Sequence, residues 1–400
     1  MSWDQLPILI SGAGIAGLLT AQALKRLEIP FIIFDRDESV SSRGQGWGIT
    51  LHWALNDFLS LLPENIQHKV FECQVLEDFH LNDSGNFVYI NAGTANSLVH
   101  IPPSKRLRVR REQIRKTLLE GIDVNWSCKT MEVRATDAEV TVLCENGRTF
   151  TGKLLIGAEG SNSATRRFTN PDNYQLYDLP VRFLGSTVIL THEEYEEVSK
   201  HFDSLLFQGT IPSNDTFFWF SLLSSPAHNG TNFYECQVNF SWNCPNKTAE
   251  KFGTVEDKIN VIKRVSSGLN ENLMFLRDKM VAASDRFMEI RLSDWPYADF
   301  DDKQGKIILI GDACHAMVMY RGEAGNHAIA DVKLFIDLLE KCRKQENSWP
   351  EMIRAYKDDV KARAGPAVLL SRQACLDAHN WEKLKDFQLN KSPLLALRKK

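Results

Sequence analysis

The chain has 400 residues and a formal net charge of −4, and hydrophobic residues make up 43% of it. This length and composition allow a globular core in one elaborate domain or in two. A weak negative charge is not typical of a protein that binds a polyanion, so we expect no nucleic-acid partner. No apolar run approaches the roughly 20 residues of a membrane span, and the opening MSWDQLPILI lacks the segments of a signal peptide. We therefore expect a cytoplasmic protein with no membrane span, and the sequence sets no oligomeric state.

The eight cysteines are scattered along the chain, and none forms a C-x-x-C pair. Their spacing fits no common zinc pattern. We expect reduced, mostly buried thiols and no metal site.

The N-terminal segment contains a strand–glycine–helix–strand pattern. Apolar runs at 8–10 and 31–34 predict two short strands of the kind that a parallel sheet buries on both faces. Between them, residues 15–27 repeat apolar side chains at a spacing of four, which predicts a helix that ends before Pro30. Together these elements predict a dinucleotide-binding unit.

The glycine and polar positions of this unit each have a physical role. Gly12 permits a tight turn, Gly14 permits close approach of the backbone to a pyrophosphate, and Gly17 lets the helix pack on the strand. The helix N-terminus offers free N–H groups and the positive end of its dipole to the phosphates. Asp35 can accept hydrogen bonds from ribose hydroxyls, and we include the adjacent Arg36 in the cofactor-binding set.

Two further predicted strands end in polar residues. The run 154–156 leads into the segment 157–160, and the run 307–310 leads into Gly311 and then Asp312. Ligands dock at the carboxyl ends of parallel strands, so Asp312 is a candidate ligand-binding residue, with a helix N-cap as the alternative. A helix that is predicted to begin near Gly325 would direct its free N–H groups and the positive end of its dipole toward a ligand bound at this edge.

These three motifs, in this order and spacing, resemble those of the FAD-dependent aromatic hydroxylases of the para-hydroxybenzoate hydroxylase type, especially the members from fungal natural-product pathways. The glycine motif with Asp35 matches the ADP-binding fingerprint, 157–160 matches a segment shared by FAD and NADPH, and Asp312 matches the aspartate that binds the ribityl chain of FAD. The match extends to residues 46–49 and to Arg111. The resemblance implies FAD as cofactor and NAD(P)H as co-substrate. The cofactor-binding residues that we expect are Gly12, Gly14, Gly17, Asp35, Arg36, Gly48, Arg111, Asp312 and Gly325.

Some polar residues near these motifs have structural as well as functional interpretations. Arg111 is one of several arginines in the segment 108–115, so it could instead be an exposed surface charge. His315 and His327 invite an acid–base interpretation, but hydrogen-bonded histidines around the turn are the simpler one.

The expected fold class is α/β. We predict a Rossmann-like FAD-binding domain with a parallel sheet, and an inserted, mostly antiparallel β-sheet domain that binds the substrate. We assign residues 1–75, 105–175 and 285–400 to the FAD-binding domain, and residues 76–104 and 176–284 to the substrate domain. The second insert holds several strand-like runs separated by turn signals.

Aromatic residues are frequent in that second insert. In a strand, Phe217 and Trp219 would face one side, and Phe218 and Phe220 the other. Sheet packing explains any one of these residues. As a group they predict a sheet that covers the flavin and lines an apolar, aromatic cavity.

The chain departs from the family pattern at three positions. Met319 and Ala324 stand where the loop after the third motif usually has Pro and Gly, and Glu159 replaces the Asp of the second motif. Proline would fix the backbone of that loop, whereas methionine is flexible and oxidisable. These departures raise the question whether the redox chemistry is retained.

Two classes of enzyme follow from these observations. The first is an FAD-dependent monooxygenase that uses NAD(P)H and O₂ to hydroxylate or epoxidise an apolar, polycyclic or phenolic small molecule in secondary metabolism. The second is a non-redox cyclase, isomerase or pericyclase on the same scaffold, in which FAD is structural. A non-catalytic binding protein is a third interpretation.

Oxygen transfer of this kind needs positioning and a dry cavity more than a side-chain nucleophile. If a polar group assists, the candidates are Arg182 in the predicted sheet and Tyr320 and Glu323 in the altered loop. Arg321 is a further candidate, with an ion pair between Arg321 and Glu323 at the surface as the alternative.

Overall fold

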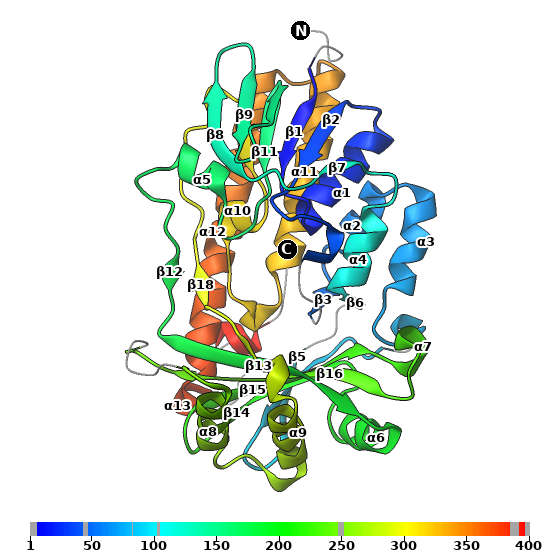
Figure 1. Ribbon diagram of the computed structural model, residues 1–400, viewed down its shortest axis with the longest axis vertical. Coiled ribbons are helices and arrows are strands. Elements are labelled where there is room, and N and C mark those ends of the chain that lie inside the picture. Colours follow the sequence, from blue (N-terminus) through cyan, green and yellow to red (C-terminus); the bar gives the residue numbers. More distant parts are fainter. Residues whose placement is uncertain are drawn as a thin grey trace.

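The fold consists of two halves, one above the other in Figure 1. The upper half contains a parallel sheet flanked by long helices, and the lower half contains a broad sheet of long strands. The computed structural model describes residues 6–42, 47–81, 83–101, 105–246, 252–384 and 392–396. Within these ranges, no helix combines the length and the apolar character that a membrane crossing requires.

The upper half is built on a five-stranded parallel sheet in the order β19-β11-β1-β2-β7. Its strands are short and apolar because both faces are covered. Side chains of β1 alternate between two cores, so Ile8 and Ile10 pack toward the long helices and Leu9 packs toward a small antiparallel sheet. The strands are β1 (Ile8–Ser11), β2 (Phe31–Phe34), β7 (Val124–Asn125), β11 (Leu154–Gly157) and β19 (Ile307–Leu309).

Helices cover one face of this sheet and a three-stranded antiparallel sheet covers the other. The helices of this half are α1 (Ile15–Arg26), α2 (Leu55–Leu61), α3 (Glu64–Glu72), α4 (Arg111–Leu118), α5 (Ala164–Thr169), α10 (Asp312–His315), α11 (Ala324–Arg343) and α12 (Trp349–Ala378). The small sheet is formed by β8 (Thr130–Ala135), β9 (Val140–Cys144) and β10 (Thr149–Gly152).

The lower half is a seven-stranded sheet in the order β17-β13-β16-β15-β14-β4-β5. All neighbouring strands in it are antiparallel except β14 and β4, which run parallel. Its strands are β4 (Phe87–Asn91), β5 (Ser97–Ile101), β13 (Val181–Leu190), β14 (Leu206–Ile211), β15 (Thr216–Ser224), β16 (Tyr234–Asn243) and β17 (Met288–Glu289). The α/β fold class with a parallel sheet and a mostly antiparallel second sheet is therefore confirmed.

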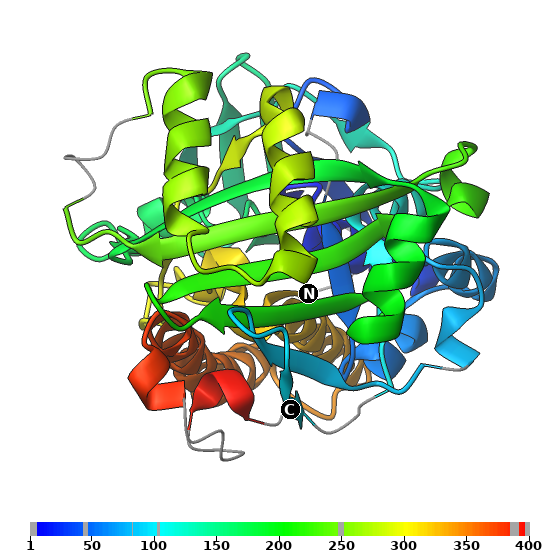
Figure 2. The same ribbon diagram turned by 90° about the horizontal axis from the view of Figure 1, so that it is seen from below.

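Three helices lie across the outer face of the large sheet, as Figure 2 shows from below. They are α6 (His192–His201), α8 (Val255–Val265) and α9 (Glu271–Ala282). The inner face is turned toward the parallel-sheet half. The domain boundaries remain a prediction. β17 follows the boundary expected at residue 285 and adds an edge strand to the large sheet.

Cross-strand pairing assigns the side chains of the large sheet to its two faces. Phe218 lies opposite Phe240, and both pack in the apolar core under the outer helices. Trp219 lies between Gln208 and Asn239 on the opposite face. Phe218 and Trp219 thus face opposite sides of the sheet, as the period of two in a strand predicts.

Short elements connect the two halves. The ribbon of β3 (Gly48–Leu51) and β6 (Leu107–Arg110) lies at the junction, and α12 runs from one half to the other (Figure 1). Thr210 donates a hydrogen bond to the carbonyl oxygen of Ala378 at the end of α12 (2.7 Å), which ties this helix to the large sheet. The remaining elements are β12 (Tyr177–Asp178), β18 (Ser293–Asp294), α7 (Pro226–Asn229) and α13 (Trp381–Leu384), with five 3-10 turns at Val40–Ser42, Phe79–Leu81, Ser284–Arg286, Met319–Arg321 and Pro393–Leu395 among the described residues.

Candidate active site

A cavity of about 560 Å³ lies beside the ends of β1 and β2 and the loop that follows β11. Gly12, Asp35, Arg36 and Glu159 contribute to its walls. The carboxyl ends of parallel strands are the usual docking place for nucleotides. The structure therefore brings the first two sequence motifs together around one cavity.

The three glycines of the first motif are needed for different reasons. A Cβ on Gly12, whose φ is +109°, would lie 2.5 Å from the carbonyl oxygen of Ala158, and a Cβ on Gly17 would lie 1.9 Å from the carbonyl oxygen of Gly12. These two glycines are required by close packing. A Cβ on Gly14 would meet no atom within 4 Å apart from its chain neighbours, and Gly14 is the N-cap of α1. The open space at the start of α1 fits a pyrophosphate.

Asp35 is buried at the end of β2 and organises the glycine loop. Its carboxylate accepts hydrogen bonds from the backbone N–H groups of Ala13 (2.5 Å) and Asp37 (2.9 Å). Each carboxylate oxygen can accept a second hydrogen bond, so a ribose hydroxyl remains an acceptable partner. The guanidinium of Arg115 donates to the carbonyl oxygens of Ala13 (3.0 Å) and Val40 (3.0 Å), a support for the loop that no sequence motif indicates.

Glu159, one of the three departures from the family pattern, stabilises α5. Its carboxylate accepts hydrogen bonds from the Ser163 hydroxyl (2.6 Å) and from the Thr165 backbone N–H (3.2 Å) and hydroxyl (2.5 Å). A carboxylate at this position satisfies backbone donors at a helix N-terminus and interacts favourably with its dipole. Arg166 on α5 then donates to the carbonyl oxygen of Asp312 (3.2 Å), which connects the second motif to the third.

Asp312 is the first residue of α10 and follows Gly311, whose φ is +62°. Burial raises the pKa of the Asp312 carboxyl, and nearby positive charge, including that of Arg111, opposes this shift. Arg111 begins α4, and its backbone N–H donates to the carbonyl oxygen of Trp47 (2.9 Å). Arg111 is half-buried and lies within electrostatic range of Asp312, which disfavours an exposed surface charge.

A buried ionic network lies behind this turn. Asp331 on α11 accepts hydrogen bonds from the Gly311 backbone N–H (2.8 Å), from His315 Nε2 (2.6 Å) and from Arg363 Nη2 (2.8 Å). Burial would raise the pKa of Asp331, but His315 and Arg363 hold it at about 2. Arg363 Nη1 also lies 3.1 Å from Nδ1 of His327. The two histidines are therefore bonded within the framework around the turn, as the simpler interpretation predicted.

A second cavity, of about 230 Å³, lies between the β3–β6 ribbon and the inner face of the large sheet. Gly48, Met319, Tyr320 and Gly325 line it, so residues from the altered loop and from the ribbon meet there. Ala324, the second departure in the loop, begins α11, lines the second cavity and packs against a small apolar cluster of Met317 with Ala367 and Val368 of α12. Gly46 lies outside the described residues.

The three candidate catalytic residues have different positions. The Tyr320 hydroxyl donates to the Ser241 hydroxyl (2.8 Å) and the side chain borders the second cavity. Glu323 is buried and forms an ion pair with Arg321 (2.6 Å), so the expected pair exists but in the interior and not at the surface. Glu323 does not line the cavity among the residues that the structure describes there.

The assignment of Arg182 to the cavity needs correction. Arg182 lies opposite Trp242 in the sheet, and its guanidinium stacks 4.5 Å from the ring of Phe252 and pairs with Glu289 (2.9 Å). Trp242 belongs to the outer face, where the core under α8 and α9 lies. A role for Arg182 at the flavin is not supported, because the side chain points to the wrong face of the sheet.

Several residues of the second cavity carry no recognisable sequence signal. The guanidinium of Arg108 is buried there and donates to the hydroxyls of Thr50 (3.1 Å) and Ser221 (2.8 Å). A Cβ on Gly48 would lie 2.4 Å from Nη2 of Arg108, so Gly48 makes room for this cation. Burial lowers the pKa of Arg108 to about 9.

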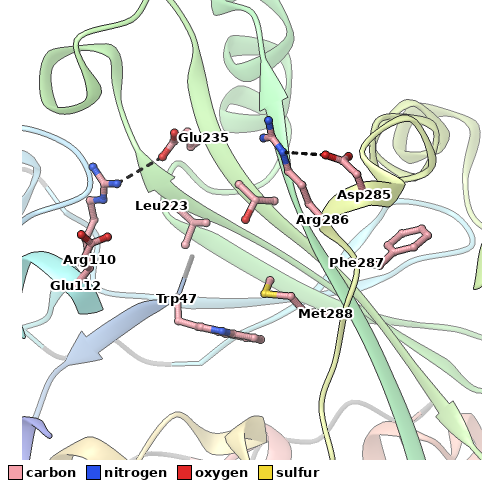
Figure 3. Close-up of a pocket in the computed structure, with 10 residues that line it drawn as sticks. Trp47, Arg110, Glu112, Leu223, Glu235, Asp285, Arg286, Phe287 and Met288 are labelled. Atoms are coloured by element: carbon pink, nitrogen blue, oxygen red, sulfur yellow. Dashed lines mark ion pairs between the residues drawn. The ribbon is translucent and has the colours of Figure 1, made fainter. Parts of the chain in front are cut away.

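A third cavity, of about 480 Å³, adjoins the second and shares Trp47 with it (Figure 3). Figure 3 shows two ion pairs at its border, one between Arg110 and Glu235 (3.6 Å) and one between Asp285 and Arg286 (4.0 Å). Both cavities lie between the ribbon and the large sheet, so Trp47 forms part of the wall between them.

No protein-family model matches the chain. A probable FAD-dependent monooxygenase of Arthroderma benhamiae is 35% identical over 98% of this chain and 95% of that protein. The FAD-dependent monooxygenase dbaB of Emericella nidulans is 38% identical over 82% of this chain and 85% of that protein.

Solved structures share the fold. HpxO of Klebsiella pneumoniae complexed with FAD and uric acid has a TM-score of 0.74 and 17% identity, and covers 94% of this chain and 90% of its own. A 2,6-dihydroxypyridine-3-hydroxylase from Arthrobacter nicotinovorans has a TM-score of 0.77 and 14% identity, and covers 99% of this chain and 98% of its own.

The similarity to curated relatives spans nearly the whole chain and includes both halves of the fold. It confirms the expected resemblance, the expected FAD cofactor and the interpretation as an oxidoreductase. The non-redox and binding-only alternatives are not favoured, because the relatives are named monooxygenases. The chain belongs to the family of FAD-dependent monooxygenases.

Proposed function

We propose that this enzyme uses NAD(P)H and O₂ to hydroxylate or epoxidise a small aromatic molecule in secondary metabolism. The observation that carries this proposal is the second cavity, which has aromatic walls and opens beside the turn expected to hold the flavin. The names of fungal relatives support the oxygenase class. We further propose that its partner is a small-molecule substrate and not nucleic acid, and that it acts in the cytoplasm.

The residues present fit FAD. Gly12, Asp35 and Arg36 border the cavity that fits the nucleotide, and Gly14 leaves open space at the N-terminus of α1. Asp312 begins α10 shortly after β19, the strand that pairs with β11 in the parallel sheet. The chemistry that FAD supplies when bound is reductive activation of O₂ for transfer of one oxygen atom to the substrate.

The contribution of this chain is to bind, to orient and to exclude water. Trp219, Trp47 and Phe87 give the second cavity an aromatic lining that holds a flat molecule and keeps bulk water away. Tyr320 holds the altered loop against the large sheet through its hydrogen bond to Ser241. Burial raises the pKa of Tyr320 well above its ordinary value, so its hydroxyl stays protonated and acts as a donor.

The proposal is tested by measuring NAD(P)H oxidation and O₂ uptake by the purified flavoprotein with and without phenolic compounds. We expect oxidation that depends on O₂ and that a substrate accelerates, with an oxygenated product. Formation of a rearranged product at the same rate without O₂ would instead establish the non-redox alternative.

A further inference from the structure

The inner face of the large sheet carries three buried carboxamides, each with one polar atom that has no protein partner. They are Gln208, Gln237 and Asn239, and each side chain is at most 2% exposed. The unpartnered atoms are Oε1 of Gln208, Nε2 of Gln237 and Oδ1 of Asn239. All three residues line the second cavity.

Strand pairing places these carboxamides close together. Trp219 lies directly opposite Gln208 on one side and opposite Asn239 on the other, and Gln237 lies opposite Ser221, two residues along. Directly opposite residues have Cβ atoms about 5 Å apart. Gln208 and Asn239 therefore flank the indole ring of Trp219 from the two neighbouring strands, and Gln237 lies beside Asn239 on β16; we call these three residues the amide patch.

Neighbouring polar side chains have hydrogen-bond partners within the protein, unlike the three carboxamide atoms of the amide patch. The indole N–H of Trp219 donates to the Ser221 hydroxyl (3.0 Å), and Arg108 donates to the same hydroxyl (2.8 Å). A Cβ on Gly185 would lie 2.2 Å from Oδ1 of Asn239, so the glycine leaves room for this carboxamide. The site is thus shaped around groups that lack partners within the protein.

Leaving a buried donor or acceptor without a partner is costly. Natural cores keep such groups only for a reason, and here they face a cavity in which the proposed function places a substrate. The two unpartnered oxygens accept hydrogen bonds, and the unpartnered amide nitrogen donates them. A matching ligand offers hydroxyl groups to the oxygens and a carbonyl oxygen to the nitrogen.

We propose that the amide patch selects planar phenolic ketones, with the hydroxyls of the substrate donating to Gln208 and Asn239 and its carbonyl accepting from Gln237. This inference rests on the proposed function, because it names the substrate class of the same site. It excludes purely hydrocarbon polycycles, which would bury the amide patch without partners. Trp219 provides the flat surface against which the aromatic ring lies.

Binding is measured with the FAD-loaded protein by the change in flavin absorbance on titration with three probes. Resacetophenone carries two hydroxyls and a carbonyl, acetophenone lacks the hydroxyls, and ethylresorcinol lacks the carbonyl. We expect resacetophenone to bind roughly 10–100-fold more tightly than either analogue, since each analogue leaves part of the patch unpaired. Equal affinities for the three probes, or no binding at millimolar concentration, overturn the proposal.

Variants assign the discrimination to individual residues. Asn239→Leu and Gln208→Met should each reduce the preference over acetophenone by roughly tenfold, and Gln237→Met should remove the preference over ethylresorcinol. Gln74→Met is the matched control, because Gln74 is buried but bonded to the carbonyl oxygen of Phe71 (2.9 Å) away from the cavity. It should leave the discrimination unchanged.

A second readout separates recognition from a structural role. Gln208→Met and Gln237→Met remove unpartnered polar atoms, so the substrate-free protein should melt at an equal or higher temperature while it binds resacetophenone more weakly. A lower melting temperature together with unchanged discrimination contradicts the proposal. Selective binding without any O₂ uptake would contradict the proposed function alone, whereas O₂ uptake that all three probes stimulate equally would contradict only this inference.

Discussion

Replacing Gly14 by valine should separate cofactor binding from folding. Gly14 has an ordinary φ of −78° as the N-cap of α1, and no atom apart from its chain neighbours lies within 4 Å of the position that a Cβ would take, so the folded chain has room for the new side chain. We expect a loss of stability of about 1 kcal/mol or less, the usual scale at an N-cap. The same side chain fills the space that a pyrophosphate needs at the helix N-terminus, so the variant should purify without FAD.

Gly17→Val supplies the contrast. A Cβ there would lie 1.9 Å from the Gly12 carbonyl oxygen, so α1 must move away from β1 and the chain should fail to fold. Gly253→Ala, before α8 and with an ordinary 3.4 Å contact to Oδ2 of Asp257, is the control that should keep both fold and flavin. Flavin content is read from the visible spectrum and folding from thermal melts by circular dichroism. A Gly14→Val protein with a full complement of FAD would refute the reasoning.

Three further predictions concern the same structure. Asp312→Ala should weaken FAD binding to the apoprotein by roughly 1–3 kcal/mol in a fluorescence titration, because a charge-assisted hydrogen bond is lost, and an unchanged affinity would rule out a cofactor contact. Trp47→Ala should join the second and third cavities, so more hydrogen peroxide should form per NAD(P)H oxidised, and unchanged coupling would show that Trp47 does not separate them. Burial lowers the pKa of His379 from 6.5 to about 4. Between these pH values the unfolded chain binds a proton at His379 that the folded chain does not bind. The free energy of unfolding therefore falls as the pH drops from 6.5 towards 4. His379→Gln should reduce this fall by up to about 3 kcal/mol in urea titrations across that range, and an identical pH dependence would contradict the assignment.

The parallel-sheet half is largely predictable because its signals are local. The strand 31–34 appears at the predicted residues, and the glycine motif lies between it and β1 as expected. Such a unit needs short apolar strands, a tight turn and a helix within one stretch of about 30 residues, so each part supports the others. The roles of Gly12 and Gly17 then follow from contacts that only this arrangement creates.

The residues of the substrate cavity are less predictable because they depend on register between distant strands. A shift of one residue moves every side chain of a strand to the other face. Arg182 is expected at the flavin from its sequence, but its neighbour in β16 is Trp242, which faces the outer helices. Asn239 faces the cavity from the same strand, and no feature of its local sequence distinguishes it from a surface asparagine.

The departures from the family pattern have local physical explanations, and these bear on whether the chemistry is retained. The longer side chain of Glu159 reaches the N-terminus of α5, where it accepts three hydrogen bonds from Ser163 and Thr165. The methyl group of Ala324 adds apolar surface against α12, which a glycine would not provide. Met319 lines the second cavity beside Tyr320, whose hydrogen bond to Ser241 holds this loop in place without the rigidity of a proline. Each replacement is therefore matched by contacts that keep the turn and the cavity intact, which agrees with membership of a redox family.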